Sequence, residues 1–588
     1  MSELGTQTVT RRTVLRGLGT GALGLAGAAL LGCGAKPAGG GAPAASSQGQ
    51  EQGGKGNGAW LPLVAPVVQG KPKNGGTFNY AATASFLQHD PGTALAGNVW
   101  HVIGEKGLEP DPQTASIRPH VLTSWEVADP SGTTLIFKVA PNLFTHNMAP
   151  FNGRQFTAED VAWNMERIGG LYAEKLKIPL SAFQRASMVG NIQKAVAVDP
   201  LTVKVTLSKP NSSFFNGLMD TRVPFAPKEM DDVGWTDPMK MGGIGPYQIT
   251  SSIKDQAMTF KKFDKYFRPG EPHFDNYNIP IVPDRTATIA AFLSGQNQLI
   301  TNLVPTEIDS IRKVKPDSQL YSWIDSNWNH FRPGMAYEPF RDFRVRKAIS
   351  LAMDRNALSD AYYGPGWGYQ SSMCPGYPEA WRPEKVKALP GYNPDTKAAD
   401  RAEAQKLMTA AGYPNGKGLD WDIIFTASTG SSVANDDSTR FIAQMQSQFS
   451  DIKIVIKPLP DSATFATQQA AGKFKMVAYT ITAAPDAVVE MTSQYYTGGS
   501  RNYGQFTDKN VDALLDKAQV ELNRDARTKL MDDFQGKFET DWMPMYVLRA
   551  NPARHFIPGN VGGYDTVAGT WYGYSYYTKA SRWFYVEA

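Results

Sequence analysis

Polar and apolar residues alternate in two parts of the chain, and a period of two predicts β-strands. The segment Ala195–Leu207 ("AVAVDPLTVKVTL") contains two such runs around an Asp-Pro turn, with Val203 and Val205 on one face. The segment Ile452–Lys457 ("IKIVIK") alternates in the same way, but Val455 makes its second face partly apolar. We therefore expect a hairpin in the first segment and a buried strand in the second.

Three other segments repeat apolar residues every three or four positions, which predicts helices with one buried face. Thr157 precedes the first of them as an N-cap, and Asp160 follows three residues later, a relative of the capping box. The three apolar stripes are Val161, Met165 and Ile168; Val345, Ile349 and Ala352; and Val511, Leu514, Leu515 and Ala518. Strands and helices alternate in the later half of the chain, so we predict an α/β layer structure there.

The N-terminal pattern differs from both of these. Arg11, Arg12 and Arg16 precede a Gly/Ala/Leu run that ends in "LLGC" at Cys33, after which the chain becomes small and polar. A lasting transmembrane helix needs about 20 apolar residues, so this run predicts a secretory signal instead. The pair Arg11-Arg12 resembles a twin-arginine export signal, an ordinary basic signal being the alternative. "LLGC" resembles a bacterial lipobox, which predicts a lipid on Cys33 and an extracytoplasmic, membrane-anchored protein.

Composition limits what the rest of the chain can do. Residues 34–74 are rich in Gly, Ala, Ser and Pro, which predicts a flexible tether. The 588 residues are 42% apolar and carry a formal net charge of +4, which predicts a large core and no nucleic-acid partner. There are two cysteines, and one of them is expected to carry lipid, so no disulfide framework is expected.

No motif for catalysis or metal binding stands out. The chain has no G-x-S-x-G nucleophile elbow, no H-E-x-x-H and no Cys/His pair with metal-ligand spacing. The Gly-rich "GLGTGALG" belongs to the export signal. We therefore expect a protein that is not an enzyme and has no cofactor and no metal site. Binding of nickel or haem as a carried complex is the open alternative, and it has no motif here.

A series of motifs between about residues 73 and 553 resembles the large solute-binding proteins of bacterial ABC importers, the family 5 type that includes oligopeptide-, dipeptide- and nickel-binding members. The series begins with "GGTFNYAATASFLQHDPG" and continues with a long segment, Arg118–Ile168, that contains "SWEV" and "FTAEDVAWNMERI". The later motifs are "GGIGPYQI", "PIVPDRTATIAAFLSGQ", "PFRDFRVRKAISLAMDRNAL", "KLMTAAGYPNGKG" and "VDALLDKAQVEL". A single motif of this kind is weak, but this many in the same order make a specific resemblance.

The resemblance implies a two-lobed periplasmic-binding-protein fold of the large, class C type, with an extra subdomain in the first lobe and a hinge between the lobes. After the signal (1–33) and tether (34–74), the first lobe is expected at 75–107, 229–323 and 552–588, with the extra subdomain at 108–228. The second lobe is expected at 324–551. The solute would lie between the lobes and stabilise the closed form. The expected partners are a solute, a permease with its ATPase subunits, and a membrane reached through Cys33; the chain is expected to be a monomer.

One departure from the family bears on the solute. In peptide-binding relatives a carboxylate shortly after the strand that matches "FKMVAYTITAAPDA" meets the peptide's ammonium group, and an arginine lies a few residues earlier. The corresponding positions here are Ala483 or Ala484, and Ala478. A buried ammonium without a partner is costly, so the usual recognition of a peptide end is in doubt. Asp486 could substitute if the loop shifts.

Aromatic residues are the other candidates for solute contact, since their faces stack on sugar rings, apolar groups or cations. The second-lobe candidates are Trp328, Trp367, Tyr479, Tyr495 and Tyr503, and the first-lobe candidate is Tyr80. For each of them, ordinary packing is the alternative. We therefore expect a solute-binding subunit for a peptide-like or other small polar or amphipathic solute. The alternatives are an oligosaccharide-binding member of the family, a binding protein that feeds a sensor and, with least support, a secreted hydrolase.

Overall fold

The computed structural model describes residues 70–82, 89–93, 99–110, 117–183, 185–363, 368–375, 377–426, 431–484, 486–564 and 577–587. The chain divides into a unit of residues 1–50 and a unit of residues 51–588, and all described residues belong to the second. The predicted signal residues Arg11, Arg12 and Cys33, and most of the tether, lie outside the described residues.

The first lobe is built on a four-stranded sheet of order β11-β12-β13-β2, in which β2 lies parallel to β13. Phe78, Tyr247, Phe260 and Tyr277 form the aromatic part of its core. The elements of this lobe are β1 (Pro72–Lys73), β2 (Thr77–Asn79), α2 (Trp100–Ile103), β3 (Glu105–Lys106), α6 (Met230–Val233), β11 (Tyr247–Ile253), β12 (Ala257–Lys262), β13 (Asn276–Pro280), α7 (Arg285–Leu293), α8 (Pro305–Val314), β19 (Val561–Gly562) and β20 (Phe584–Val586). The C-terminal β20 pairs with β1, so both ends of the folded body meet in one small sheet.

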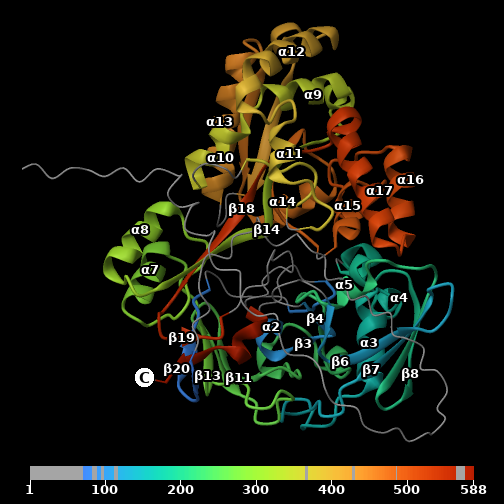
Figure 1. The fold of residues 1–588 in the computed structure, drawn as a ribbon, viewed down its shortest axis with the longest axis vertical. Coiled ribbons are helices and arrows are strands. Elements are labelled where there is room, and N and C mark those ends of the chain that lie inside the picture. The colour runs from blue at the N-terminus through green and yellow to red at the C-terminus, as the bar shows by residue number, and fades with distance from the viewer. Residues whose placement is uncertain are drawn as a thin grey trace, which may run out of the picture. The chain divides into compact units, whose positions relative to one another are not determined.

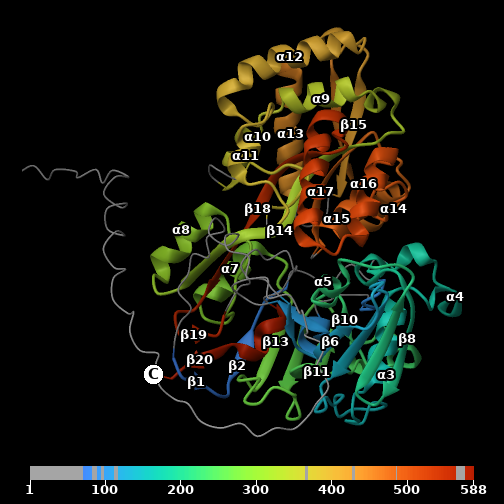
Figure 2. The ribbon, with the colours of Figure 1, turned by 45° about the vertical axis from the view of Figure 1, so that its right-hand side comes forward.

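The extra subdomain contains the predicted hairpin. Its four-stranded antiparallel sheet has the order β6-β7-β9-β8, and α3 packs on β8 and β9 (Figure 2). Its elements are β4 (Leu108–Pro110), β5 (Ile117–Pro119), β6 (Leu122–Val127), β7 (Thr134–Val139), α3 (Ala158–Ile168), α4 (Ala173–Leu176), η2 (Ala186–Val189), β8 (Ile192–Asp199), β9 (Thr202–Leu207), α5 (Phe214–Leu218) and β10 (Pro224–Phe225). The hairpin is confirmed as β8 and β9, and Val203 and Val205 are fully buried as the alternation predicts.

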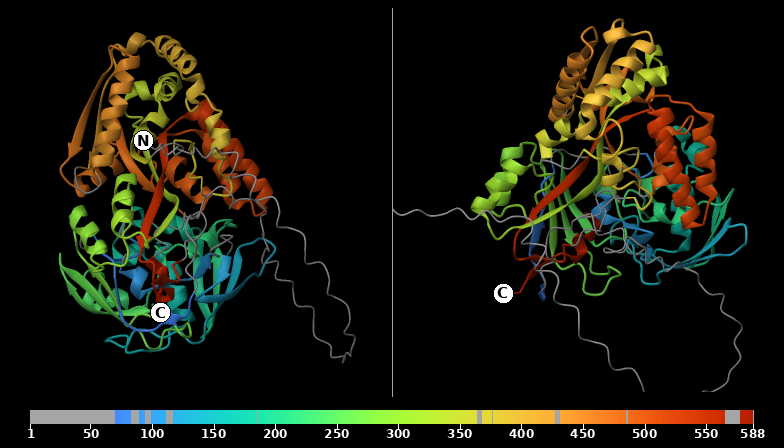
Figure 3. Two further views of the ribbon diagram at one scale, coloured as in Figure 1. Left: turned by 60° about the vertical axis from the view of Figure 1, so that its left-hand side comes forward. Right: turned by 45° about the horizontal axis from the view of Figure 1, so that its top comes forward.

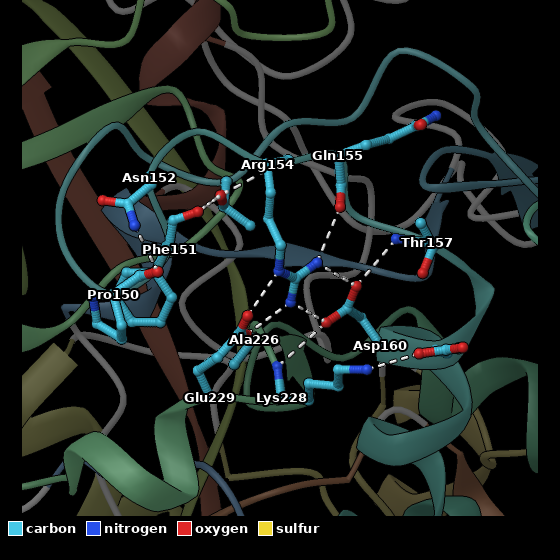
Figure 4. A network of polar contacts seen from close by, with 12 residues as sticks. Pro150, Phe151, Asn152, Arg154, Gln155, Thr157, Asp160, Ala226, Lys228 and Glu229 are labelled. Carbon is cyan, nitrogen blue, oxygen red and sulfur yellow. Dashed lines mark hydrogen bonds and ion pairs between the residues drawn. The ribbon is translucent and has the colours of Figure 1, made fainter.

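A polar network fixes α3 to the chain that returns towards the first lobe (Figure 4). Asp160 accepts a hydrogen bond from the Thr157 backbone N–H, as the sequence predicts, at 2.9 Å. Arg154 forms ion pairs with both Asp160 and Glu229, each at 2.6 Å. The network therefore connects the subdomain at the predicted boundary between residues 228 and 229.

The second lobe is an α/β layer structure around a five-stranded sheet of order β16-β15-β17-β14-β18. Strands β15, β16 and β17 are parallel, whereas β14 lies antiparallel to β17 and β18. The elements are β14 (Gln319–Pro333), α9 (Phe343–Ala352), α10 (Arg355–Tyr363), α11 (Pro383–Lys387), α12 (Lys397–Ala410), β15 (Asp420–Thr426), α13 (Ser431–Gln448), β16 (Lys453–Leu459), α14 (Ser462–Ala470), β17 (Met476–Thr482), α15 (Ala487–Tyr495), α16 (Lys509–Val520), α17 (Arg524–Lys537) and β18 (Tyr546–Ile557). The predicted helical stripes are confirmed in α3, α9 and α16, whose apolar positions are buried.

One strand prediction is wrong. The segment around Ile454 forms β16 as expected, but within the described residues β16 is an edge strand that pairs with β15 alone. Val455 is 58% exposed and lies on the same face of the strand as the exposed Lys453 and Lys457. Its two partly apolar faces therefore do not indicate a strand buried on both sides.

The long strands β14 and β18 run side by side from the first lobe into the second (Figures 1 and 3). Near one end, Phe556 packs with residues of α7 and α8 and forms a bridge with Ile300. Near the other end, Phe331 pairs with Tyr546 inside the second lobe. The pairing register shifts between residues 324 and 328, at the level where the sequence places the boundary between the lobes. Two paired strands with an irregularity at that level are suitable for a hinge.

Candidate functional site

The turn between β17 and α15 is the place where the second lobe meets the extra subdomain, and Asp486 lies at its centre. As the N-cap of α15, Asp486 accepts hydrogen bonds from the backbone N–H groups of Val488 and Val489. The same carboxylate accepts hydrogen bonds from Ser213 Oγ at 2.6 Å and Asn216 Nδ2 at 2.7 Å, both from the segment that forms α5. Asp486 therefore joins two parts of the molecule that are some 270 residues apart in sequence.

The charge of Asp486 is balanced inside the second lobe. Arg527 of α17 forms an ion pair with Asp486 at 2.5 Å and with Glu379 at 3.4 Å. Burial alone would raise the pKa of Asp486, but the Arg527 charge and the hydrogen bonds from Ser213 and Asn216 lower it below its usual value. Asp486 is thus ionised at neutral pH and fully engaged, so a solute's ammonium group would have to compete with these partners.

Further contacts extend this interface, which we call the interlobe seam and define by Ser212, Ser213, Asn216 and Arg222 of the subdomain and their second-lobe partners. Arg222 donates a hydrogen bond to the Ala483 carbonyl oxygen at 2.9 Å. The Ser212 backbone N–H donates to the Gln519 carbonyl oxygen at 3.0 Å. The seam is therefore polar and is held by hydrogen bonds between the subdomain and the second lobe.

The backbone at Ala483 and Ala484 is also occupied. The Ala484 N–H donates to Glu490 at 2.7 Å, and the Ala484 carbonyl oxygen accepts a hydrogen bond from Tyr377 Oη at 2.5 Å. Both alanine side chains are buried. The position at which peptide binders are expected to carry a carboxylate is thus a tightly held turn with methyl side chains.

Beside the seam, β14 and β17 present a group of polar side chains on one face of the sheet. His330 pairs with Tyr479, and Arg332 pairs with Val477, so His330 and Arg332 lie on the same face as Tyr479. The rings of His330 and Tyr479 meet edge to face at 5.9 Å. We call His330, Arg332, Tyr479, Arg501 and Tyr503 the arginine–tyrosine cluster.

The arginines of this cluster hold it together. Arg332 lies over the ring of Tyr503, with its guanidinium carbon 5.7 Å from the ring centre. It donates to the Arg501 carbonyl oxygen at 2.5 Å and to the side-chain oxygen of Gln494. Arg501 forms an ion pair with the fully buried Glu490 at 3.0 Å.

Charge and burial set the protonation state of the cluster. Burial, together with the charges of Arg332 and Arg501, holds the pKa of His330 well below its usual value, so this imidazole is neutral at pH 7. Burial lowers the pKa of Arg332 to about 10, which leaves the guanidinium charged at pH 7. Burial raises the pKa of Tyr479, against the opposing effect of Arg501, Arg332 and Arg185, so its hydroxyl stays protonated. The cluster therefore offers cations and hydroxyl groups.

The structure divides the predicted aromatic residues into two groups. Tyr479 and Tyr503 are half-buried and lie together in the cluster. Trp328 and Tyr495 are 0% and 2% exposed, and Tyr80 is buried in the first-lobe core. In this structure these last three residues are core residues. Trp367 lies outside the described residues.

Sequence reasoning did not single out Arg222, Arg332, Glu490 or Arg501. A signal was available for Arg332, because a charged residue is unusual in a strand that also contains Trp328 and Phe331. Arg222 and Arg501 lie in turns, and nothing in their local pattern separates them from ordinary surface arginines. Their roles depend on contacts over more than 200 residues for Arg222 and across α15 for Arg501.

The described residues contain no cluster of metal ligands and no membrane-spanning helix. No group of three or more His, Cys, Asp or Glu side chains there is arranged to hold a metal ion. Among the helices of the same residues, none is long and apolar enough to cross a membrane.

Comparison with known proteins identifies the family. Residues 116–503 match the middle region of the bacterial extracellular solute-binding proteins, family 5. The chain belongs to this family. The match includes most of the extra subdomain, most of the second lobe and the whole arginine–tyrosine cluster.

Similar proteins extend the likeness beyond the matched region. Heme-binding protein A of Haemophilus influenzae is 24% identical over 508 residues, which are 81% of this chain and 88% of that protein. Glutathione-binding protein GsiB of Shigella boydii is 23% identical over 410 residues, 67% of this chain and 75% of that protein. The periplasmic binding protein DppA of Helicobacter pylori, solved with the peptide STSA, is 19% identical with a TM-score of 0.72 over 88% of this chain and 99% of that one. This structural likeness confirms the two-lobed periplasmic-binding-protein fold.

Proposed function

We propose that this chain is the solute-binding subunit of an ABC importer, which captures a peptide-like or similar small polar solute between its lobes and delivers it to a transmembrane permease. The observation that carries the proposal is the family 5 match over residues 116–503, which includes both sides of the interlobe seam. The paired strands β14 and β18 support this proposal, because such a capture requires a hinge and the register of this pair shifts between the lobes. The curated relatives are named for binding, and no catalytic motif occurs in this sequence.

The alanines at positions 483 and 484 limit the class of solute that the chain is proposed to bind. A carboxylate for a peptide's ammonium group is absent at these two positions, and Asp486 already has five donors around it. The proposed solute is therefore recognised by groups other than a free amino terminus.

A thermal-shift screen tests the proposal. Di- and tripeptides, their N-acetylated forms and short oligosaccharides would each be added to the purified mature protein. A solute present at 100 times its dissociation constant adds about 2.7 kcal/mol of stability, which is readily measured. Stabilisation by members of one class supports the proposal and names the class, whereas turnover of a solute without stabilisation would favour an enzyme.

The anchoring on the membrane is a second part of the proposal. The lipobox-like "LLGC" supports a lipid on Cys33, and Arg11-Arg12 supports export by the twin-arginine route. A Cys33→Ser variant should appear in the soluble fraction, because the protein would lose its acyl chains. Fractionation and immunoblotting would detect this; a variant that stays wholly with the membrane contradicts lipid anchoring. An Arg11→Lys, Arg12→Lys double variant that is exported normally contradicts the twin-arginine route.

A further inference from the structure

Among the arginines near the interlobe seam, Arg332 differs from its neighbours in its partners. Arg222 pairs with Asp220 at 2.6 Å, Arg501 with Glu490 at 3.0 Å and Arg527 with Asp486 at 2.5 Å. Arg332 forms no ion pair with any described carboxylate, and its acceptors are a backbone carbonyl oxygen and a side-chain amide oxygen. Glu490 balances the charge of Arg501, but no described carboxylate pairs with Arg332. The arginine–tyrosine cluster therefore carries one positive charge that is not balanced by an ion pair.

This charge is deeply buried. Arg332 is 2% exposed, and its Nε is a buried donor that no described acceptor contacts. Arg346, on α9 of the same lobe, is comparably buried at 4%, but each of its guanidinium nitrogens donates to a backbone carbonyl oxygen. A buried cation destabilises a fold when it has no counter-ion and one of its N–H groups has no acceptor. Such a destabilising arrangement is retained where function requires it.

A second buried polar atom lies beside Arg332. His330 is 1% exposed, and its Nδ1 has no hydrogen-bond partner among the described residues. The ring of His330 contacts Tyr479, and Arg332 lies over Tyr503; both tyrosines are half-buried, so the cluster reaches the surface through them. The side chain of Arg501 is 23% exposed and places a second cation at the same edge.

We propose that the arginine–tyrosine cluster binds an acidic group of the transported solute, a carboxylate or a group of the same charge, with Tyr479 and Arg501 in contact and Arg332 as the balancing charge behind them. This proposal deepens the proposed function, on which it rests. An anion at this edge would neutralise the excess charge of Arg332 in a low-dielectric environment, where such an interaction is strong. Because His330 is neutral, it adds hydrogen bonding and no further charge.

If the cluster binds an acidic group, a solute without a negative charge should bind more weakly than its acidic counterpart. Two sources of the acidic group share this chemistry: the terminal or side-chain carboxylate of a peptide, and the carboxylate of a sugar acid. The test therefore uses matched pairs from both, in which only the charge differs. The pairs are N-acetyl-trialanine with its C-terminal amide, N-acetyl-alanyl-glutamate α-amide (side-chain carboxylate free) with N-acetyl-alanyl-glutamine α-amide, and trigalacturonate with its methyl ester.

The experiment measures the thermal shift of the full mature protein with each member of each pair. We expect at least one acid to stabilise the protein more than its neutral partner, with the pair that responds identifying the source. Arg332→Met should weaken affinity for that acid by about tenfold or more, because a hydrogen-bonded charge is lost. Arg332→Lys should retain part of the preference, since it keeps the cation. Arg346→Met is the matched control, and it should retain the preference at a lower melting temperature.

Tyr479→Phe covers the case in which Arg332→Met fails to fold, because it removes one hydroxyl and keeps the ring. We expect this variant to lose affinity for the acid and to leave the melting temperature of the solute-free protein nearly unchanged. Equal stabilisation by the acid and the neutral member of every pair would overturn the inference and leave the proposed solute-binding function intact. A preference for acids that survives in both Arg332→Met and Tyr479→Phe would also overturn it, since the acidic group would then bind elsewhere. No stabilisation by any compound would count against both proposals.

Discussion

Some single residues in this protein make contacts that their local sequence does not indicate, and Asp486 is the clearest example. Its position directly before a helical run is typical of an N-cap, and it does cap α15. Its contacts with Ser213, Asn216 and Arg527 depend on the folded chain and could not be predicted from the pattern. The sequence therefore identified the residue as a candidate for contact, and the structure supplied a different set of partners.

These partners predict the cost of removing the side chain. Asp486→Ala should lower the free energy of unfolding by about 3 kcal/mol or more, because a buried Arg527 loses a partner along with the helix cap. Asp508→Ala is the matched control: Asp508 caps the neighbouring α16 and contacts two backbone N–H groups, so its loss should cost about 1 kcal/mol. Urea unfolding of both variants would measure the difference. Equal costs would contradict a role for Asp486 beyond capping.

The role of Arg332 is another property of a single residue that the sequence alone does not predict. A charged residue in a buried strand is an unusual pattern, but the sequence does not say whether a carboxylate balances it. In the folded chain the nearby carboxylates are engaged by other arginines, and this arrangement depends on contacts between β14, α15 and the Arg501 segment. Only the structure could therefore identify it as the basis of a binding hypothesis.

Elements were predicted well where one face is buried against a single neighbour. The hairpin β8–β9 and the stripes of α3, α9 and α16 have a strong period, and packing agrees with it. Strand β16 was misjudged because alternation describes the two faces of a strand and not its neighbours in the sheet, which decide whether it lies at an edge. The neighbours result from long-range pairing, which the local sequence does not contain.

The close contact between α2 and the "GGIG" segment predicts that a larger residue at Gly243 destabilises the protein. A Cβ added at Gly243 would lie 1.8 Å from the Ile103 carbonyl oxygen, and the Gly245 N–H donates to that same oxygen at 2.8 Å. Gly243→Ala should therefore cost more than about 2 kcal/mol, since backbone must move. Differential scanning calorimetry would show it as a lower melting temperature.

Gly536 in α17 provides the matched control. A Cβ at this helical position would meet nothing within 4 Å. Gly536→Ala should stabilise the protein by roughly 0.5–1 kcal/mol, because alanine loses less conformational entropy than glycine in a helix. If Gly243→Ala is tolerated as well as Gly536→Ala, the close approach of α2 to the "GGIG" segment is contradicted.

At the scale of the whole molecule, buried charges join segments that are distant in sequence. Glu109 of β4 forms ion pairs with Arg582 near the C-terminus at 2.5 Å and with Arg268 at 3.4 Å. Burial alone would raise the pKa of Glu109, but His120, Lys106 and the two arginines hold it well below its usual value. The extra subdomain is thereby fixed to the first lobe and the C-terminal tail.

This lowered pKa predicts how stability depends on pH. The ionised Glu109 contributes fully above the pKa of an unfolded glutamate, about 4.3, and its contribution is lost as the pH falls through the lower folded value. Glu109→Gln should therefore be about 3 kcal/mol less stable than the wild type at pH 7, and the difference should shrink as the solution is made more acidic. Urea unfolding at pH 7, 5 and 3 would measure it. A difference that stays constant over this range would contradict the ionic role of Glu109.

The order of many motifs was sufficient to predict the two-lobed architecture, but it was not sufficient to predict the interlobe seam. Motifs mark segments with similar local structure, and the seam arises where α5 and α15 meet across two parts of the chain. The predicted lobe boundaries near residues 324 and 552 face each other on β14 and β18, which is consistent with a hinge there. They stay a prediction until opening is observed.

We have proposed that the folded body holds a small solute between its lobes. Native mass spectrometry of the mature protein purified from its own cells, followed by denaturation, tests it most directly. We expect a mass above that of the polypeptide and its lipid. On unfolding, the extra mass should be released as one small molecule that carries an acidic group. A protein whose mass is that of the lipidated chain alone, and which stays so after incubation with peptide and sugar-acid mixtures, would contradict it.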